Sequence, residues 1–318
     1  MSKKNNTIKY FLLYLFERTS LFLLTTIVRI IPIKFLYNLL KKTGVAGSYV
    51  LFSHRRRIMK NLDLAFGSEK SKKQKKEIYR AVTANFVISF FEAFSSLYNR
   101  NKQYLIKSTR IVGQENLDAS LRKGKGVIAV SGHIGSFGIM GVKMKAAGYR
   151  FYAVIRGLSN PYTQKRYSYY CNLQDQRFIF SRPYKEAIKS ILRALRKNEI
   201  VLLVTDENRR HGGVFVDFFN HPAATAVGSA TLQLRTGADI VPMFMVRNQD
   251  NTHTLVIEPA LEIAYTENRK ADIVEITQLI TKRIENHIRR HPSQWSWSNR
   301  RWRTRPPEEQ FQEIYRNY

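Results

Sequence analysis

The sequence contains a single cysteine, Cys171, among its 318 residues. It therefore holds neither an intramolecular disulfide nor a metal site built from several cysteines, and nothing in it requires an oxidising compartment. It also lacks the HExxH pattern of zinc peptidases and the GxxxxGK[ST] loop of P-loop nucleotide-binding proteins. These absences leave no metal centre or organic cofactor to be predicted from a motif.

Acidic residues are scarce as well. The chain has 24 Asp and Glu against 53 Lys and Arg, which gives a formal charge of +29. This excess predicts a negatively charged partner, such as nucleic acid, anionic lipid or an acidic protein. The basic residues are spread along the chain and match no helix-turn-helix, zinc or RNA-binding signature, so nucleic acid is not the predicted partner. With 44% hydrophobic residues, the chain has enough apolar material for a large core.

The first 45 residues are dense in apolar side chains but contain no run of about 18 uncharged ones, so a clean transmembrane span is not established. Lys3 and Lys4 precede an apolar run at 10–16, and Arg29 follows a second run at 21–28. Apolar residues beside positive charge predict a membrane-anchor segment over 1–45, as a short imperfect span or an interfacial helix. The alternative is a pair of N-terminal core helices.

Residues 46–318 are predicted to form one α/β domain, because strand and helix patterns alternate along them. A long helix is expected over 72–97. Apolar runs predict strands at 126–131, 151–156, 177–180, 200–205, 240–246 and 253–258. Helical periodicity predicts helices at about 136–147, 160–173, 184–197, 227–236 and 270–290. The expected fold is a mixed, largely parallel sheet flanked by helices.

The segment Gly132-His133-Ile134-Gly135 directly follows the predicted strand at 126–131. Glycines there allow a sharp turn from strand to helix, which would place the imidazole of His133 at the mouth of the sheet. A histidine in that position can act as a general base. The alternative is a turn histidine that makes only structural hydrogen bonds.

Several segments together resemble the late (secondary) acyltransferases of lipid A biosynthesis, within the lysophospholipid acyltransferase superfamily. Each segment is weak alone, but their order and spacing over about 55–307 are specific to that family. The matching segments are 54–66, 132–138, Arg156 with 160–162, 205–208, 212–219, Val241-Pro242, 289–295 and 301–307.

The resemblance implies transfer of a fatty acyl group from acyl carrier protein, or a coenzyme A thioester, to a hydroxyl. The implied acceptor is lipid A or a related anionic glycolipid precursor, with simple lysophospholipids as an alternative. It also implies location at the cell inner membrane with the catalytic domain facing the cytoplasm, His133 as general base, and no metal or cofactor.

The chain departs from the family pattern five positions after His133, where the family carries an acid that orients the imidazole. Here Ser136, Phe137 and Gly138 replace Asn, Trp and Glu. Three hypotheses follow: an active enzyme with a relocated acid, an altered transferase, or a protein that binds anionic lipid or carrier protein without turnover. We favour the first. Asp206 and Glu207, after the strand at 200–205, are the best candidates for the replacement acid, and Asp206 is the predicted catalytic residue.

The remaining candidates are polar or glycine positions in the matching segments. Arg156 is predicted to bind an anionic group, although a surface ion pair is an equal alternative. Asp206 could instead cap a loop or pair with a nearby arginine, and the glycines at 212 and 213 favour a tight turn over phosphate binding. The predicted substrate-binding residues are Arg156, Asn160, Ser136, Arg209, Gly212 and Gly213.

The C-terminal segment contains every tryptophan, interleaved with arginines at 300, 301, 303 and 305. Trp295, Trp297 and Trp302 could serve a membrane interface or a phosphate-rich ligand. The favoured interpretation is a tail packed on the domain with solvated arginines. In the same way, Phe215, Phe218 and Phe219 are predicted to be core rather than a wall for an acyl chain.

Overall fold

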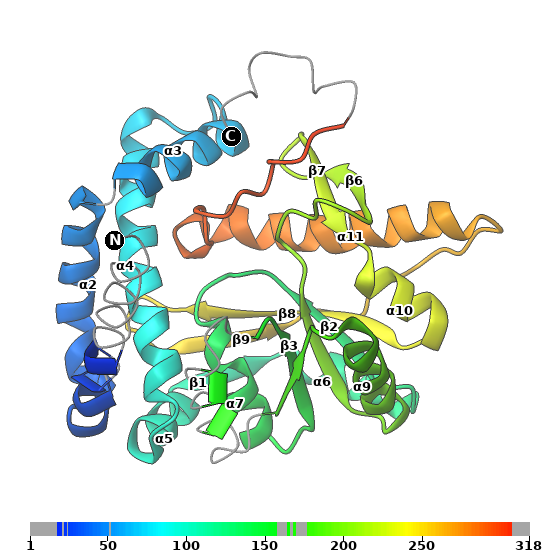
Figure 1. Ribbon diagram of the computed structural model, residues 1–318, viewed down its shortest axis with the longest axis horizontal. Helices are drawn as coiled ribbons and strands as arrows, with labels where there is room; N and C mark the ends of the chain where they lie inside the picture. Colours follow the sequence, from blue (N-terminus) through cyan, green and yellow to red (C-terminus); the bar gives the residue numbers. More distant parts are fainter. Residues whose placement is uncertain are drawn as a thin grey trace, which may run out of the picture.

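The computed structural model describes residues 18–20, 22–23, 25–50, 52–157, 164–165, 168–169 and 177–306. They form a seven-stranded sheet with helices on both faces and a separate two-stranded hairpin (Figure 1). The sheet is mixed and mostly parallel, as the alternating sequence pattern predicts.

The six predicted strands are confirmed to within one residue at each end. They are β2 (Val127–Ser131), β3 (Phe151–Ile155), β4 (Arg177–Phe180), β5 (Ile200–Val204), β8 (Asp239–Arg247) and β9 (His253–Ile257). Three further strands were not predicted: β1 (Thr109–Val112) and the hairpin strands β6 (Gly213–Asp217) and β7 (Pro222–Ala226).

The strand order in the large sheet is β1-β9-β8-β2-β5-β3-β4. Every neighbouring pair is parallel except β8 and β9, which are antiparallel. The carboxyl ends of β2, β5 and β3 therefore lie at the same edge of the sheet. In open parallel sheets, the loops at that edge are where ligands bind.

Alternation along the strands divides the interior into two cores, one on each face of the sheet. Ile128 and Val130 of β2 belong to one core, while Val127 and Ala129 belong to the other. The first core is covered by α3 (Phe52–Phe66), α9 (Tyr184–Arg196), α10 (Gly228–Thr236) and α11 (Arg269–Arg290). The second is covered by α2 (Ile33–Val50), α5 (Asn99–Lys107), α6 (Gln114–Arg122) and α7 (Met140–Ala146).

Two of the predicted helices are confirmed only in part. The helix expected over 136–147 is confirmed only from residue 140, because a 3-10 turn, η1 (Phe137–Ile139), comes first. Gly135 has φ +56°, and this left-handed residue turns the chain before η1 begins. The helix expected over 160–173 lies mostly outside the described residues, although 164–165 and 168–169 are helical.

The helices α2 and α4 (Lys72–Ser95) lie side by side at one end of the sheet (Figure 1). They approach closely at Gly44, where a Cβ atom would lie 2.5 Å from Ala84 Cα. In the described part of the chain, no single helix is both long and apolar enough to cross a membrane; α4 and α5 reach that length and composition only together, with a 120° bend between them. The first apolar run, at 10–16, lies outside the described residues.

The C-terminal segment is packed on the domain, which confirms the interpretation favoured from sequence. Trp295, Trp297 and Trp302 are buried against Phe218 and Phe219. The expectation of solvated arginines is only half right. Arg301 and Arg305 are buried, whereas those at 300 and 303 are exposed.

Candidate active site

His133 lies in the turn between β2 and η1, where glycines bring the backbone close to its neighbours. A Cβ atom on Gly132 would lie 3.1 Å from the Asp206 carboxylate. A Cβ atom on Gly135 would lie 2.1 Å from the Met245 carbonyl oxygen, far inside contact distance. The turn can therefore sit this deep in the sheet edge only because these two positions carry no side chain.

The parallel register of β2 and β5 brings His133 and Asp206 together. Ser131 pairs with Val204, and each candidate residue follows its strand partner by two positions. Asp206 Oδ1 lies 2.8 Å from His133 Nδ1, and Asp206 Oδ2 accepts the backbone N–H of His133 at 2.8 Å. One carboxylate thus fixes both the ring and the backbone of the histidine, and leaves Nε2 as the ring nitrogen free for proton transfer.

The electrostatics of the pair favour an ionised carboxylate beside a basic imidazole. Burial works against the charged form of His133, but the Asp206 carboxylate and its hydrogen bond more than offset this and raise the pKa of His133 to about 9. Burial also works against charged Asp206, yet His133 and the Trp295 hydrogen bond hold the pKa of Asp206 below its usual range. The neutral histidine tautomer with hydrogen on Nδ1 matches this arrangement.

The C-terminal segment supports Asp206 from behind. The Trp295 indole donates a 2.7 Å hydrogen bond to Asp206 Oδ2, and the Ser296 N–H donates to the His133 carbonyl at 3.2 Å. The buried Arg301 guanidinium donates to the Ala224 carbonyl, and burial lowers its pKa to about 10 although Asp206 acts in the opposite direction. The packed C-terminal segment therefore fixes the Asp206 carboxylate, which in turn orients His133.

A cavity of about 390 Å³ begins next to this turn. The rings of His133 and Phe137 pack edge to face, with their centroids 5.0 Å apart. Phe137 lines the cavity together with Gly138, Ile155 and Val204. From there the cavity follows β3 along its whole length, which at about 3.3 Å per residue is roughly 13 Å. Its walls are mostly apolar.

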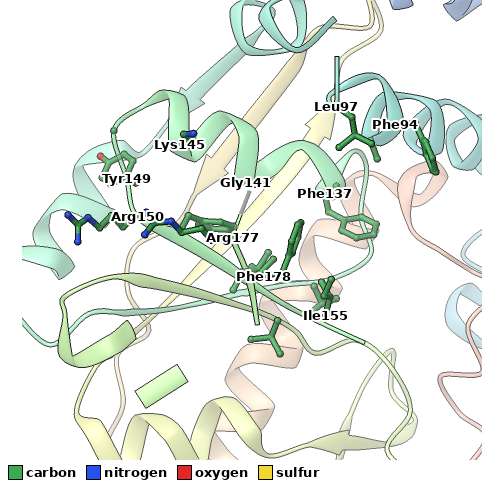
Figure 2. Close-up of a pocket in the computed structure, with 18 residues that line it drawn as sticks. Phe94, Leu97, Phe137, Gly141, Lys145, Tyr149, Arg150, Ile155, Arg177 and Phe178 are labelled. Atoms are coloured by element: carbon green, nitrogen blue, oxygen red, sulfur yellow. The ribbon is translucent and has the colours of Figure 1, made fainter. Parts of the chain in front are cut away.

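The far end of the cavity has a different chemistry. Figure 2 shows Lys145, Arg150 and Arg177 grouped at one end, whereas Phe94 and Phe137 lie at the other. The basic end corresponds to the amino ends of β3 and β4, away from His133. The cavity is thus an apolar channel that runs from Phe137, beside the histidine, to a basic rim.

Ser136 was predicted from sequence to contact substrate, and the structure corrects this. Its side chain is only 1% exposed, and its hydroxyl donates to Glu92 and accepts from Arg247 at 2.7 Å. It therefore faces the interior between α4 and β8. Gly138, where the family acid was expected, packs against α4, and a Cβ there would lie 3.1 Å from Ala93 Cβ.

The remaining sequence candidates lie apart from His133 or outside the described residues. Arg156 is exposed at the carboxyl end of β3, on the same sheet edge as His133. Arg209 Nε donates to the His211 carbonyl at 2.9 Å, within the loop before β6. Gly212 has φ +67°, as expected for the tight-turn alternative. Asn160 lies outside the described residues.

Three residues around the turn were missed by sequence reasoning: Glu92, Arg247 and Trp295. Glu92 carries a weak signal, because it is a lone acid in the otherwise apolar end of the helix predicted over 72–97. Arg247 directly follows the strand predicted at 240–246, and Trp295 belongs to a family-like segment. Nothing in the sequence links these three to the turn, because their contacts with Ser136 and Asp206 join residues 44 or more positions apart.

Comparison with known proteins decides the family. A family model described as bacterial lipid A biosynthesis acyltransferase matches residues 3–304. The chain belongs to this family. Its place among the acyltransferases of lipid A and glycolipid biosynthesis, expected from the segment resemblance, is thereby confirmed.

Curated relatives carry two kinds of name. A phosphatidylinositol mannoside acyltransferase of Mycobacterium tuberculosis is 26% identical over 193 residues, which is 60% of this chain and 59% of that protein. A lipid A biosynthesis acyltransferase of Haemophilus influenzae is 24% identical over 280 residues, 86% of this chain and 84% of that protein. The relatives thus include proteins named for two different glycolipids.

Among solved structures, the 1-acyl-sn-glycerophosphate acyltransferase of Thermotoga maritima is similar over 83% of this chain and 99% of that chain. The TM-score is 0.36 and the identity is 13%.

Proposed function

We propose that this protein transfers an acyl group from a thioester to a hydroxyl of an anionic glycolipid, with His133 as general base and Asp206 as the acid that orients it. The observation that carries the proposal is the His133–Asp206 pair, joined at 2.8 Å, beside the mouth of a long apolar cavity. The relocated-acid hypothesis is therefore favoured over a protein without turnover, because Asp206 occupies the role left open at Gly138.

In the proposed reaction, His133 Nε2 accepts the proton of the acceptor hydroxyl as its oxygen attacks the thioester carbonyl. The carbonyl carbon gains a C–O bond and loses its C–S bond, and the imidazolium returns its proton to the departing thiolate. Asp206 holds the ring and stabilises the cation, as the carboxylate of a hydrolase triad does. Arg156 and Asn160 stay the proposed contacts for an anionic group of donor or acceptor, and Arg209, Gly212 and Gly213 stay proposed parts of the acceptor side.

The donor's acyl chain is proposed to occupy the cavity along β3. The apolar walls suit a hydrocarbon, and the cavity starts at Phe137, whose ring touches His133. The donor is proposed to be acyl carrier protein or a coenzyme A thioester; the former is acidic and suits a chain of +29 charge.

Filling the middle of the cavity should shorten the preferred acyl chain. Ala153 of β3 lines the cavity, and Ala153→Leu adds bulk against the hydrocarbon. We expect the ratio of kcat/KM for long over short donors to fall at least about tenfold, because each misfit methylene costs about 1–3 kcal/mol. The measurement is kcat/KM across a donor series. Ala146→Leu, exposed on α7, is the matched control and should leave the ratio unchanged; an unchanged ratio in Ala153→Leu would place the chain elsewhere.

Membrane association is proposed to use the exposed faces of α2 and α4. Phe35 and Leu39 of α2 are 67% and 56% exposed, and Phe86 and Phe90 of α4 are 65% and 46% exposed. The Phe90 ring lies 4.7 Å from that of Phe94, which lines the cavity. An apolar surface thus leads from the exposed helix face to the channel. Residues 1–45 are proposed as an interfacial anchor of a domain over 46–318 on the cytoplasmic side of the inner membrane, with the division falling inside α2.

Removing the exposed apolar side chains of α2 should weaken binding to anionic vesicles. Inserting a large apolar side chain contributes up to about 1.5–3 kcal/mol, so Phe35→Ser with Leu39→Ser should lower the partition coefficient at least about tenfold. Sedimentation with vesicles of mixed neutral and anionic phospholipid measures this. Tyr184→Ser, which removes an equally exposed aromatic side chain from α9, is the control. Equal partition of the double variant and wild type would remove α2 from the proposed membrane surface.

The test of the proposed function is product formation read by mass spectrometry. Purified full-length protein is supplied with acyl carrier protein thioester or coenzyme A thioester, and with one of three acceptors. These are an under-acylated lipid A precursor, a phosphatidylinositol mannoside and a lysophospholipid. We expect an acylated glycolipid in at least one arm. Acylation of the lysophospholipid alone would change the acceptor class, and no product in any arm would favour a lipid-binding protein without turnover.

A further inference from the structure

Glu92 is a buried acid that the proposed reaction does not use. It lies in α4, and its side chain is fully buried. Arg247 at the end of β8 donates to both carboxylate oxygens, at 2.5 Å and 3.2 Å. His253 Nε2 lies 3.1 Å from the same carboxylate. Burial alone would raise the pKa of Glu92, but Arg247 and His253 lower it to about 2, so the group is a carboxylate at every working pH.

The same carboxylate holds the turn that carries His133. The Ser136 hydroxyl donates to Glu92, and Arg247 donates to that hydroxyl at 2.7 Å. One helical turn earlier in α4, the Ser89 hydroxyl donates to the Gly135 carbonyl at 3.1 Å. Arg247 also donates to Ser89 at 2.9 Å. The two residues before η1 are therefore tied to α4 and β8 by a charged network.

The other side of Glu92 reaches α2. The Tyr37 hydroxyl donates to Glu92 Oε1 at 2.9 Å, and Tyr37 is buried. Phe35 and Leu39, two residues to either side of Tyr37, point outward and are exposed. A single carboxylate thus contacts the turn of the candidate active site and the helix whose outer face is apolar.

We propose that Glu92 is a positioning residue of this acyltransferase site. Through its hydrogen bond with Ser136 it fixes the position of the turn that carries His133, and through its hydrogen bond with Tyr37 it couples that position to the packing of α2. The inference rests on the proposed function, since it needs His133 to act as the base.

Two physical arguments support it. A charged group with hydrogen bonds from three elements has little freedom, so it fixes whatever it holds. Position matters because a displacement of about 1 Å in a reacting group can cost about 10²-fold in rate. Gly138 brings no acid to the turn, and a Cβ there would already lie 3.1 Å from Cβ of Ala93, the residue after Glu92. The buried carboxylate that the Ser136 hydroxyl contacts comes from α4.

The experiment compares three variants of the full-length protein with two controls. Ser136→Ala removes the hydroxyl that bonds Glu92 and Arg247 to the turn, Tyr37→Phe removes the hydrogen bond from α2 to Glu92, and Glu92→Gln removes the charge. Asp272→Asn is the control for a buried carboxylate, which accepts two hydrogen bonds from Thr266 on the far side of the domain. Thr281→Val is the control for a buried hydroxyl. The readouts are kcat, KM for the donor, and melting temperature.

We expect Ser136→Ala to lower kcat by about tenfold to a hundredfold with KM for the donor unchanged, because misplacing the base slows the chemical step without loosening substrate. Tyr37→Phe should act in the same direction but less, since its hydroxyl touches Glu92 and not the turn. Both controls should lower the melting temperature by as much as the Ser136 and Tyr37 variants do, but leave kcat unchanged. If Glu92 had only a structural role, the Ser136 and Tyr37 variants would behave like these controls.

Wild-type kcat in Ser136→Ala and Tyr37→Phe, beside an inactive His133→Ala, would overturn this inference and leave the proposed function standing. Should Glu92→Gln fail to fold, these two variants still decide. A wild-type protein that transfers no acyl group would overturn the proposed function, and this inference with it.

Discussion

Replacing His133 by alanine should abolish acyl transfer while the protein stays folded. The general base disappears, and with it the partner of Asp206, so proton removal from the acceptor hydroxyl falls to water. In a serine protease, loss of the histidine base costs about 10⁶-fold in kcat, and we expect at least about 10⁴-fold here. The side chain is 28% exposed and sits at the sheet edge, so its removal opens no large cavity in either core.

The measurement is the initial rate of product formation with saturating donor and acceptor, beside a melting curve. His221→Ala is the control, because that half-buried histidine lies between β6 and β7 and its ring is hydrogen-bonded to the Leu64 carbonyl. It should keep its turnover while losing some stability. A His133→Ala protein with more than about one per cent of wild-type turnover would remove His133 from the role of base, since general-base catalysis contributes about 10²-fold or more.

The sheet was predictable because its central strands are buried on both faces. The runs at 126–131 and 200–205 are nearly continuous β-branched and apolar residues, which is typical of interior parallel strands. The missed strands lack that signal. β1 is four residues long and mixed in polarity, and β7 consists mostly of alanine, with low strand propensity. β1 pairs with β9, far along the chain, whereas β7 pairs with β6 across a short hairpin. In neither case does the composition of the strand itself indicate the pairing.

The core of the candidate site was predictable for a related reason. His133 and Asp206 each follow a predicted strand, and neighbouring parallel strands end at one edge. What the sequence could not give is which strands are neighbours and in what register. The pairing of Ser131 with Val204 supplies both, and it turns two separate candidates into a hydrogen-bonded pair.

The surroundings of the pair were not predictable, because they arise from packing between distant segments. Trp295 reaches Asp206 only after the C-terminal tail folds back over the sheet edge, and Glu92 reaches Ser136 only after α4 packs on η1. Sequence reasoning placed Ser136 on the substrate side, in the segment that resembles the family's histidine motif. The left-handed Gly135 reverses the chain between them and sends the serine inward.

Replacing Asp206 by asparagine should leave the fold but remove most of the activity. The amide can keep one hydrogen bond to the turn, but it cannot stabilise the imidazolium and it permits the wrong ring tautomer. The equivalent change in a serine protease lowers kcat by about 10⁴-fold, and we expect a loss of that order. The Trp295 indole would still find an oxygen acceptor in the asparagine, so the melting temperature should fall by much less than the activity.

The pH dependence gives the second signature of Asp206. In wild type the carboxylate raises the pKa of His133 to about 9, so the neutral base grows tenfold per pH unit below that value. The kcat/KM of wild type should therefore rise through neutral pH and level off near pH 9. In Asp206→Asn the attraction is gone and burial lowers the pKa, so the residual activity should level off at a lower pH.

Glu207→Gln provides the matched control, because the exposed neighbouring carboxylate also raises the pKa of His133 but makes no hydrogen bond to the ring. The pH at which kcat/KM levels off should fall slightly in this variant, and turnover should stay nearly complete. The control thus separates a general loss of negative charge from loss of the orienting acid. If kcat/KM of Asp206→Asn still levels off near pH 9, another group raises the pKa of His133. If it keeps wild-type turnover, the acid that replaces the one missing at Gly138 has to be sought elsewhere around the turn.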